Sequence, residues 1–281
     1  MRNVTVSRKG ALFTLDFTRP RQPRLACGLG QCGCRINTFV WVSHRLRCIY
    51  LETPKAACTS IKKALGIRMD NLHAACAAAY FERTYGAGID TGALTPDGRR
   101  EFTALMDLAH TKTLGSPVTT PSDGEFSMFN GTADEALRTY PDYFSFVFVR
   151  NPFKKIVSTW QMFCQSANPF RSTQIKTQFG DPAADITLHR FVEKISSVDN
   201  HHWNPYLNYF PVSAAPEFVG RLETLTADWA YVTERLGIVR PLPHENRSRS
   251  VPAAFTPGDI DTIETLYRAD IDAFHYRQGP A

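Results

Sequence analysis

The segment PKAACTS, residues 54–60, combines a lysine with two hydroxyl side chains where a strand is expected to give way to a helix. Lys55 can supply a full positive charge, and Thr59 and Ser60 can donate hydrogen bonds. The first turn of a helix also carries unpaired N–H groups and a partial positive charge, so an anion fits there. These residue types predict a turn that binds phosphate or sulfate. A strand–turn–helix with a solvated lysine is the alternative that this stretch alone leaves open.

A second stretch of the same kind, VRNPF, lies at residues 149–153. The run 144–149 is apolar, aromatic and β-branched, which is typical of a strand buried on both faces, and Arg150 follows it. Pro152 suits the first position of a helix, and the pattern places Lys154, Lys155 and Ser158 off the apolar face of that helix. Because ligands gather at the carboxyl ends of parallel strands, two such ends predict a ligand with two separate anionic groups.

The elements around these turns alternate between strands and helices. Apolar runs predict short strands at 36–42, 48–51, 144–149 and 218–219. Helical periodicity predicts helices at 72–85, 99–110, 132–140, 152–163, 185–195, 226–236 and 257–274, with a strand–loop–helix over 47–66. The stretches 111–130, 198–211 and 241–250 are predicted loops. This alternation is typical of an α/β domain.

The chain has 281 residues, 43% of them hydrophobic, which suffices for one α/β domain with appendages. We divide it into a basic arm with short strands, residues 1–46, and a main domain, residues 47–281. No apolar run approaches the roughly 18–20 residues of a membrane-spanning helix. The N-terminal stretch lacks the continuous apolar core of a signal peptide. These features predict a soluble protein.

Basic residues are concentrated near the N-terminus. Residues 1–50 contain nine Lys and Arg residues against one acid, Asp16, a net charge of +8, so the remainder carries −3. A basic arm attracts polyanions such as nucleic acid, acidic glycans or membrane surfaces. An exposed, solubilising N-terminus is the alternative.

Seven cysteines are present, and Cys27, Cys32 and Cys34 cluster in ACGLGQCGCR. Their spacing matches no zinc pattern, and no Cys or His pair follows at a suitable distance. We therefore predict no metal and interpret the cysteines as free thiols in a reducing compartment.

The two anion turns together resemble those of the carbohydrate sulfotransferases that use 3′-phosphoadenosine-5′-phosphosulfate (PAPS). The similarity is greatest to the group that contains the chondroitin and related Golgi sulfotransferases, with bacterial relatives. In that family a P-K-x-x-C-T-S loop binds the 5′-phosphosulfate, and a V-R-[DN]-P-[FY] motif with a later serine binds the 3′-phosphate. The similarity covers about residues 47–277. Supporting segments are FVEKI (191–195), His202 to Pro205, LETLTADWAYV (222–232), Asn246 to Ser248 and LYRADIDAFHY (266–276).

The resemblance implies a P-loop-like, three-layer α/β fold with a central parallel sheet. It implies an enzyme of polysaccharide biosynthesis that moves a sulfuryl group from PAPS to a carbohydrate hydroxyl, without metal. The partner would be a glycan, acidic or neutral, and not nucleic acid. Golgi members carry cysteines just after the His-Trp-x-Pro segment and an N-terminal membrane anchor, whereas this chain has residues 207–211, LNYFP, and no such anchor. Both departures fit a cytoplasmic, bacterial-type relative and leave the acceptor open.

The resemblance also assigns roles to single residues. Lys55 would neutralise charge on the leaving phosphate, and Arg150 with Ser158 would bind the 3′-phosphate. Arg247 or Arg249 could close over the nucleotide, and a solvated loop is the alternative for both. The donor-binding residues implied are Pro54, Lys55, Ala56, Ala57, Cys58, Thr59, Ser60, Arg150, Ser158 and Arg247.

A histidine is the usual general base for an acceptor hydroxyl, because its pKa lies near neutrality. His110 is our first candidate, since relatives place their base in the region before the second motif. His202 is the second, and the neighbouring His201 is also considered. We expect Trp203, Tyr206 and Tyr209 to offer faces on which a sugar could stack.

Two other functions remain open. One is a P-loop-like kinase, which is disfavoured because residues 52–60 contain no glycine and no Mg²⁺-binding acid clearly follows a strand. The other is a non-catalytic polyanion-binding protein on the same fold, with the basic arm as its active part. The combination of Lys55, Arg150 and Ser158 argues against it, since polyanion binding does not require that set.

Overall fold

The structure is a computed structural model in which the chain divides into two compact units. The first unit comprises residues 1–52 and 62–145, and the second comprises residues 53–61 and 146–281. The structure describes residues 3–8, 11–16, 39–67, 126–129, 131–165, 169–210, 215–243, 254–277 and 279–280. The predicted helices at 72–85 and 99–110 lie outside the described residues, as do Cys27, Cys32, Cys34 and Cys76.

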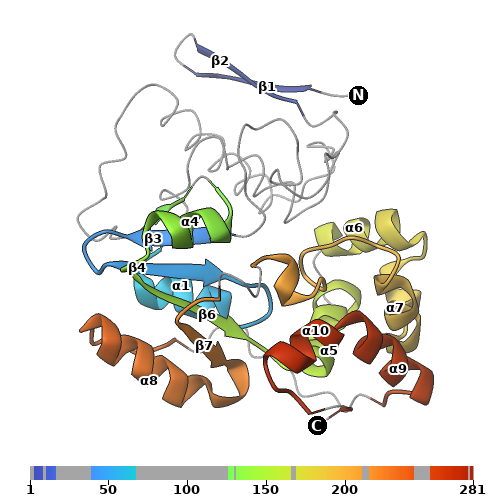
Figure 1. Ribbon diagram of the computed structural model, residues 1–281. Helices are drawn as coiled ribbons and strands as arrows, with labels where there is room; N and C mark the ends of the chain where they lie inside the picture. Colours follow the sequence, from blue (N-terminus) through green and yellow to red (C-terminus); the bar gives the residue numbers. More distant parts are fainter. Residues whose placement is uncertain are drawn as a thin grey trace. The chain divides into compact units, whose positions relative to one another are not determined.

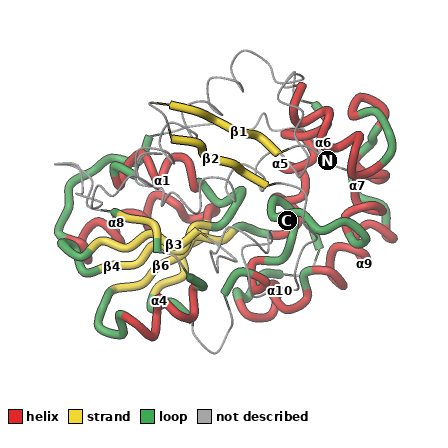
Figure 2. Tube along the Cα trace, turned by 90° about the horizontal axis from the view of Figure 1, so that it is seen from above, coloured by secondary structure: helices red, strands yellow, loops and turns green. Residues whose placement is uncertain are grey.

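The first unit contains two antiparallel hairpins. Strand β1 (Asn3–Arg8) pairs with β2 (Ala11–Asp16), and Figure 2 shows the two strands side by side. Strand β3 (Phe39–Ser43) pairs with β4 (Cys48–Glu52), and every residue of both strands is buried. The short strand β5 (Ser127–Met128) pairs antiparallel with β3. The boundary that we predicted between arm and main domain falls inside the β3–β4 hairpin.

Two helices complete the described part of the first unit. Helix α1 (Cys58–Leu65) begins in the second unit and continues, from Lys62 onward, in the first. Helix α4 (Ala133–Thr139) confirms the short helix predicted at 132–140. It begins at a capping box in which Thr132 and Glu135 each bond to the other's backbone N–H group.

The fold is mixed α/β, as expected, and the expected central parallel sheet is confirmed only in part, because β3 pairs antiparallel with both β4 and β5. The connection between β3 and β4, residues 44–47, is too short for a parallel crossover, which needs a dozen or more residues. The predicted loop at 111–130 also contains β5, which adds a further antiparallel pairing. The spacing of the first two strand-like runs therefore already excluded a parallel arrangement.

The second unit holds the parallel part of the fold. Strand β6 (Phe144–Val149), which enters this unit at Phe146, pairs in parallel with β7 (Phe218–Arg221). Helix α5 (Pro152–Cys164) follows β6, with Asn151 as its N-cap, and helix α8 (Leu225–Leu236) lies beside β7 in Figure 1. The predictions for all four elements are confirmed to within a few residues.

A helical core gathers around α5 in the second unit. It includes α6 (Pro169–Phe179), α7 (Leu188–Ile195), α9 (Pro257–Leu266) and α10 (Arg268–Ala273), which Figure 1 shows grouped together. Their buried side chains form one cluster with those of α5, which includes Phe153, Ile156, Phe163, Ile175, Phe191, Val192, Trp203, Ile263 and Ile271. This packing fixes α5, and hence the residues that follow β6.

Three helix predictions in this core need correction. Helix α6 was not predicted, because most of its residues are polar. The helix predicted at 185–195 begins only at Leu188, after a 3₁₀ turn at Ala183–Asp185. The single helix predicted at 257–274 is two helices, because Tyr267 leaves helical geometry and its hydroxyl donates to the Trp203 carbonyl. A tertiary contact therefore overrides an uninterrupted helical pattern.

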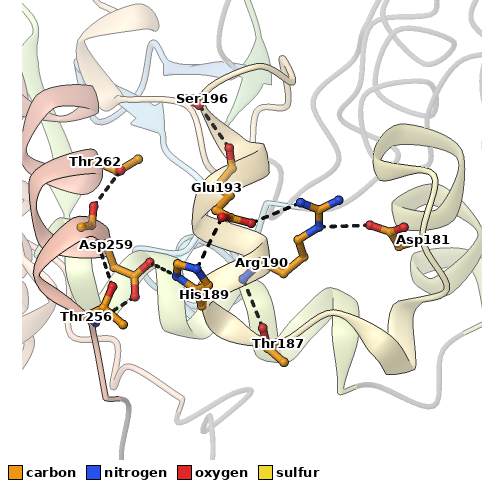
Figure 3. A network of polar contacts seen from close by, with 10 residues as sticks. Asp181, Thr187, His189, Arg190, Glu193, Ser196, Thr256, Asp259 and Thr262 are labelled. Atoms are coloured by element: carbon orange, nitrogen blue, oxygen red, sulfur yellow. Dashed lines mark hydrogen bonds and ion pairs between the residues drawn. The ribbon is translucent and has the colours of Figure 1, made fainter.

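A polar network joins α7 to α9 within the second unit, and Figure 3 shows it from close by. Asp259 forms a capping box with Thr256 at the start of α9, and its Oδ1 lies 2.8 Å from His189 Nδ1 on α7. His189 Nε2 lies 3.4 Å from Glu193 Oε1. The hydrogen bond to Asp259 raises the pKa of His189 above its ordinary value. The network holds two helices of the core together at their exposed edge.

Candidate anion-binding site

The loop before α1 holds two residues in left-handed backbone geometry, Lys55 with φ 68° and Ala57 with φ 61°. Neither is glycine, so each conformation costs on the order of 1–3 kcal/mol and persists only where the surroundings hold it. Thr53 Oγ1 donates to a backbone carbonyl of β6, and the Pro54 carbonyl accepts a 3.2 Å hydrogen bond from the Tyr206 hydroxyl. Strained loops of this kind cluster at functional sites, which favours the predicted role of the loop.

Lys55 is a partly buried cation with a weak partner. Its Nζ lies 3.6 Å from the thioether sulfur of Met162, a poor hydrogen-bond acceptor. Within the part of the chain that the structure describes, no carboxylate forms an ion pair with it. Burial lowers the pKa of Lys55 to about 8, and the charges of Arg150 and Arg171 contribute to the lowering. An anion bound beside Lys55 would stabilise its ammonium form and so offset the effect of burial.

Arg150 follows β6 and is also partly buried. Its Nε is buried and has no hydrogen-bond partner among the described residues. Burial lowers the pKa of Arg150, although the neighbouring Tyr206 and Glu223 oppose the shift. An unsatisfied buried donor costs roughly 1–3 kcal/mol, more when it is charged. An arginine fork fits phosphate or sulfate oxygens, so an anionic ligand suits this side chain.

The hydroxyl residues of both motifs lie close to the two cations in the sequence, on the helices that follow them. Thr59 and Ser60 lie in the first turn of α1, and Ser60 is only 5% exposed. Ser158 lies two turns into α5 and is 4% exposed. Ala56 is fully buried, and Cys58 forms no disulfide bond with another described residue. The structure thus brings the loop, Lys55, Arg150 and Ser158 into one unit.

His202 has a defined tautomer in this structure. Asn200 Oδ1 accepts the backbone N–H of His202 at 2.9 Å, and Asn200 Nδ2 donates to Gln178 Oε1 at 3.0 Å. These two bonds determine which atom of the Asn200 side-chain amide is the oxygen. The same oxygen lies 3.1 Å from His202 Nδ1, which must therefore carry the proton. The lone pair of His202 is left on Nε2.

The environment of His202 keeps its ring neutral. Burial lowers the pKa of His202 well below its ordinary value, and the charges of His201 and Lys55 act in the same direction. The ring meets Phe163 edge-to-face, with centroids 5.1 Å apart. A neutral imidazole with a lone pair on Nε2 can accept a proton, as a general base must. The first candidate for the base, His110, lies outside the described residues, as do Arg247 and Arg249, which were candidates for binding the nucleotide.

The aromatic residues near His202 do not offer faces to a sugar, and that expectation is wrong. Trp203 and Tyr206 are fully buried, and Tyr209 is 4% exposed. Trp203 packs edge-to-face against Phe163 and Phe179 and donates its Nε1–H to the Val198 carbonyl. These rings therefore belong to the buried interior of the second unit.

Sequence reasoning missed two cations in this region. Arg171 lies on α6, which the sequence did not predict, and its charge lowers the pKa of both Lys55 and His202. Lys155 was placed off the apolar face of its helix, yet it is fully buried. Periodicity along one helix cannot indicate these positions, since the surroundings come from other segments.

Comparison with known proteins identifies the family. The sequence pattern of the sulfotransferase family matches residues 39–277. The chain therefore belongs to the sulfotransferase family, and the match includes both anion turns and His202. Neither a search of curated proteins nor a search of solved structures found a match. Among the residues that the structure describes, no helix has the length and apolar character needed to cross a membrane.

Proposed function

We propose that this protein transfers a sulfuryl group from PAPS to a hydroxyl group of a carbohydrate acceptor. The observation that carries the proposal is the buried Nε of Arg150, which has no hydrogen-bond partner among the described residues and follows β6 in a chain of the sulfotransferase family. A second cation, Lys55, occupies the other predicted anion turn without a carboxylate partner among the described residues. Two separate cations of this kind suit a nucleotide with phosphate at both ends of an adenosine.

The loop at 54–60 would bind the 5′ side of the donor. Lys55 would stabilise the charge that grows on the leaving phosphate, and the first turn of α1 would donate N–H groups and the hydroxyls of Thr59 and Ser60. Arg150 and Ser158 would bind the 3′-phosphate, with the arginine as a fork. PAPS supplies the sulfuryl group, and these residues supply charge and position.

His202 would act as the general base in this scheme. Its Nε2 lone pair would accept the proton of the acceptor hydroxyl, while Asn200 holds the ring through Nδ1 and Gln178 holds Asn200. His110 remains the alternative base from the family resemblance. Because burial lowers the pKa of His202 well below its ordinary value, the base stays unprotonated at neutral pH.

Adenosine 3′,5′-bisphosphate (PAP), the product nucleotide, tests the donor assignment. We expect it to raise the melting temperature far more than ATP with Mg²⁺ does, and a hundredfold excess over its dissociation constant adds roughly 2.7 kcal/mol of stability. The variant Arg150→Ala should weaken PAP binding and so reduce this rise in melting temperature. Its matched control is Arg235→Ala, which removes an exposed arginine that lies 3.4 Å from Glu217. Equal shifts with ATP and Mg²⁺ would favour the kinase interpretation.

Transfer of labelled sulfate from PAPS to a panel of acidic and neutral glycans tests the acceptor. We expect product on at least one polysaccharide. If residues 1–46 steer an acidic glycan, their removal will slow turnover and flatten its salt dependence, while PAP affinity stays the same. Salt-independent kinetics in the full chain would exclude steering by the arm.

A further inference from the structure

Lys155 is a buried cation outside the set of residues assigned to the ligand. It lies on α5 between Arg150 and Ser158 and is fully buried. Its Nζ donates to the Asn204 carbonyl at 2.5 Å and lies 3.7 Å from the centroid of the Tyr206 ring. A buried ammonium is costly unless it is compensated, and a carbonyl with an aromatic face compensates only part of the charge.

Asp270 supplies the opposite charge from α10. It is fully buried, and its two oxygens accept the backbone N–H groups of Tyr206 at 2.6 Å and Leu207 at 3.0 Å. Burial lowers the pKa of Lys155 to about 7, and the charge of Asp270 opposes this shift. The two buried groups therefore both hold the backbone of 204–207, Lys155 at a carbonyl and Asp270 at two N–H groups.

Tyr206 connects this buried pair to the anion loop. Its ring lies against the Lys155 ammonium, and its backbone N–H is bound to Asp270. Its hydroxyl donates to the Pro54 carbonyl at 3.2 Å, directly before the left-handed residue Lys55. A loop in that geometry depends on contacts from outside itself. The Tyr206 hydroxyl is such a contact, and the buried pair fixes its position.

We propose that Lys155 is a positioning residue, which together with Asp270 fixes Tyr206 so that its hydroxyl holds Pro54 and the Lys55 turn in their binding geometry. The proposal deepens the proposed function and rests on it for the identity of the ligand. The positioning itself is a property of the free protein. Lys155 acts through Tyr206 and does not touch the ligand.

The variant Tyr206→Phe tests this with little risk to the fold, since it keeps the ring over Lys155 and removes only the hydroxyl. Tyr267→Phe is the matched control. Both tyrosines are fully buried and both hydroxyls donate to a backbone carbonyl, but that of Tyr267 bonds to Trp203 and not to the anion loop. We expect Tyr206→Phe to weaken PAP binding about 5- to 10-fold, the effect of one hydrogen bond. Tyr267→Phe should leave PAP affinity within about twofold of the wild type.

A second readout does not depend on the nucleotide. The rate of acetylation of Lys55 as a function of pH, followed by mass spectrometry, reports the pKa of Lys55, which burial lowers to about 8. In Tyr206→Phe and in Lys155→Met the released loop should expose Lys55 and move its pKa up toward the ordinary value. Lys155→Arg, which keeps the charge and can stack on Tyr206, should restore the low pKa at least in part.

These measurements separate the two proposals. An unmoved Lys55 pKa in a folded Tyr206→Phe variant, with wild-type PAP affinity, overturns the positioning role and leaves the proposed function intact. A wild-type protein that does not bind PAP overturns the proposed function, and the Lys55 pKa still decides the positioning role. A Lys55 pKa that moves equally in Tyr267→Phe also overturns the positioning role, because the effect is then not specific to the hydrogen bond between Tyr206 and Pro54.

Discussion

Two lysines of the second unit are buried, Lys55 in part and Lys155 fully, but their surroundings differ. Lys155 has a carbonyl, an aromatic face and the nearby charge of Asp270. Among the described residues, the hydrogen-bond partner of Lys55 is a thioether sulfur, and Cys58 only partly opposes the lowering of its pKa by burial. The pKa is lowered by burial in both, to about 7 for Lys155 and about 8 for Lys55. Burial of a cation therefore does not by itself indicate a ligand site, whereas the weak partner of Lys55 supports the anion site that we propose.

The largest expected effect concerns the compensated lysine. Asp270→Asn removes the charge that offsets Lys155, and breaking one partner of a buried pair costs about 3–5 kcal/mol of unfolding free energy. Urea denaturation followed by circular dichroism measures it. Lys154→Met, at the exposed neighbouring position, is the control and should change stability by less than about 0.5 kcal/mol. A loss below about 1 kcal/mol in Asp270→Asn would mean that the two buried groups do not compensate each other.

The next largest effect concerns Lys55, the lysine without a nearby carboxylate among the described residues. Lys55→Met should leave stability nearly unchanged or raise it, because a poorly partnered buried charge is removed. Its kcat should fall by ~10²–10³, the scale of removing one donor that acts in the transition state. PAP affinity should fall less, since Arg150 and the backbone N–H groups remain. A variant that loses stability but keeps its turnover number would reverse the comparison. Lys176→Met, on an exposed position of α6, should change neither quantity.

Arg150 extends the comparison to a second partly buried cation, whose Nε has no hydrogen-bond partner among the described residues. Arg150→Ala should weaken PAP binding ~10- to 100-fold, since charged hydrogen bonds contribute about 1.5–3 kcal/mol each. AMP, which lacks the 3′-phosphate, should lose little affinity in this variant. Isothermal titration with both nucleotides measures the difference. If Arg150→Ala weakens AMP and PAP equally, the arginine does not bind the 3′-phosphate and the donor orientation in our proposal is wrong.

The contrast between the two lysines also shows what the sequence could and could not predict. The strand before Arg150 and the helix after it were predictable, because a run of buried β-formers and a proline at the first helical position are local signals. The burial of Lys155 was not, because Asp270 and Tyr206, which compensate it, come from distant segments. The periodicity of a predicted helix indicates which of its faces is apolar. It does not indicate which residues of other segments will surround a buried polar side chain.

The same limit applies to the general base. His202 was a candidate by residue type, but its tautomer depends on Asn200 and, through it, on Gln178 of α6, a helix that the sequence did not indicate. The antiparallel pairing of β3 and β4 is the opposite case. The short connection at 44–47 was visible in the sequence and required that pairing, so this antiparallel part of the sheet could have been predicted.

The smallest expected effect is the pH dependence of donor binding, and it isolates the charge of Lys55. Burial lowers the pKa of Lys55 to about 8 in the free protein, and a bound anion must raise it again by favouring the ammonium form. PAP affinity should therefore be greatest below about pH 8 and should fall, by up to about tenfold per pH unit, as the pH rises through that value. Binding near pH 8 should take up a fraction of a proton. Titrations in two buffers with different ionisation enthalpies measure that uptake directly.

Lys55→Met is the control for this last experiment and should bind PAP with almost no change in affinity between about pH 7 and about pH 9, because phosphate groups, with a second pKa of about 6, are already largely ionised there. The stability of the free protein gives an independent check of the sign. Since the folded pKa of Lys55 lies below the unfolded one, the unfolded chain binds more protons above about pH 8, and the contribution of Lys55 to stability rises there. Bound PAP should remove this rise in stability above about pH 8, because the anion favours the ammonium form of Lys55. If wild type and Lys55→Met show the same pH dependence of affinity, Lys55 does not contact the anion, and the difference between the two lysines has another cause.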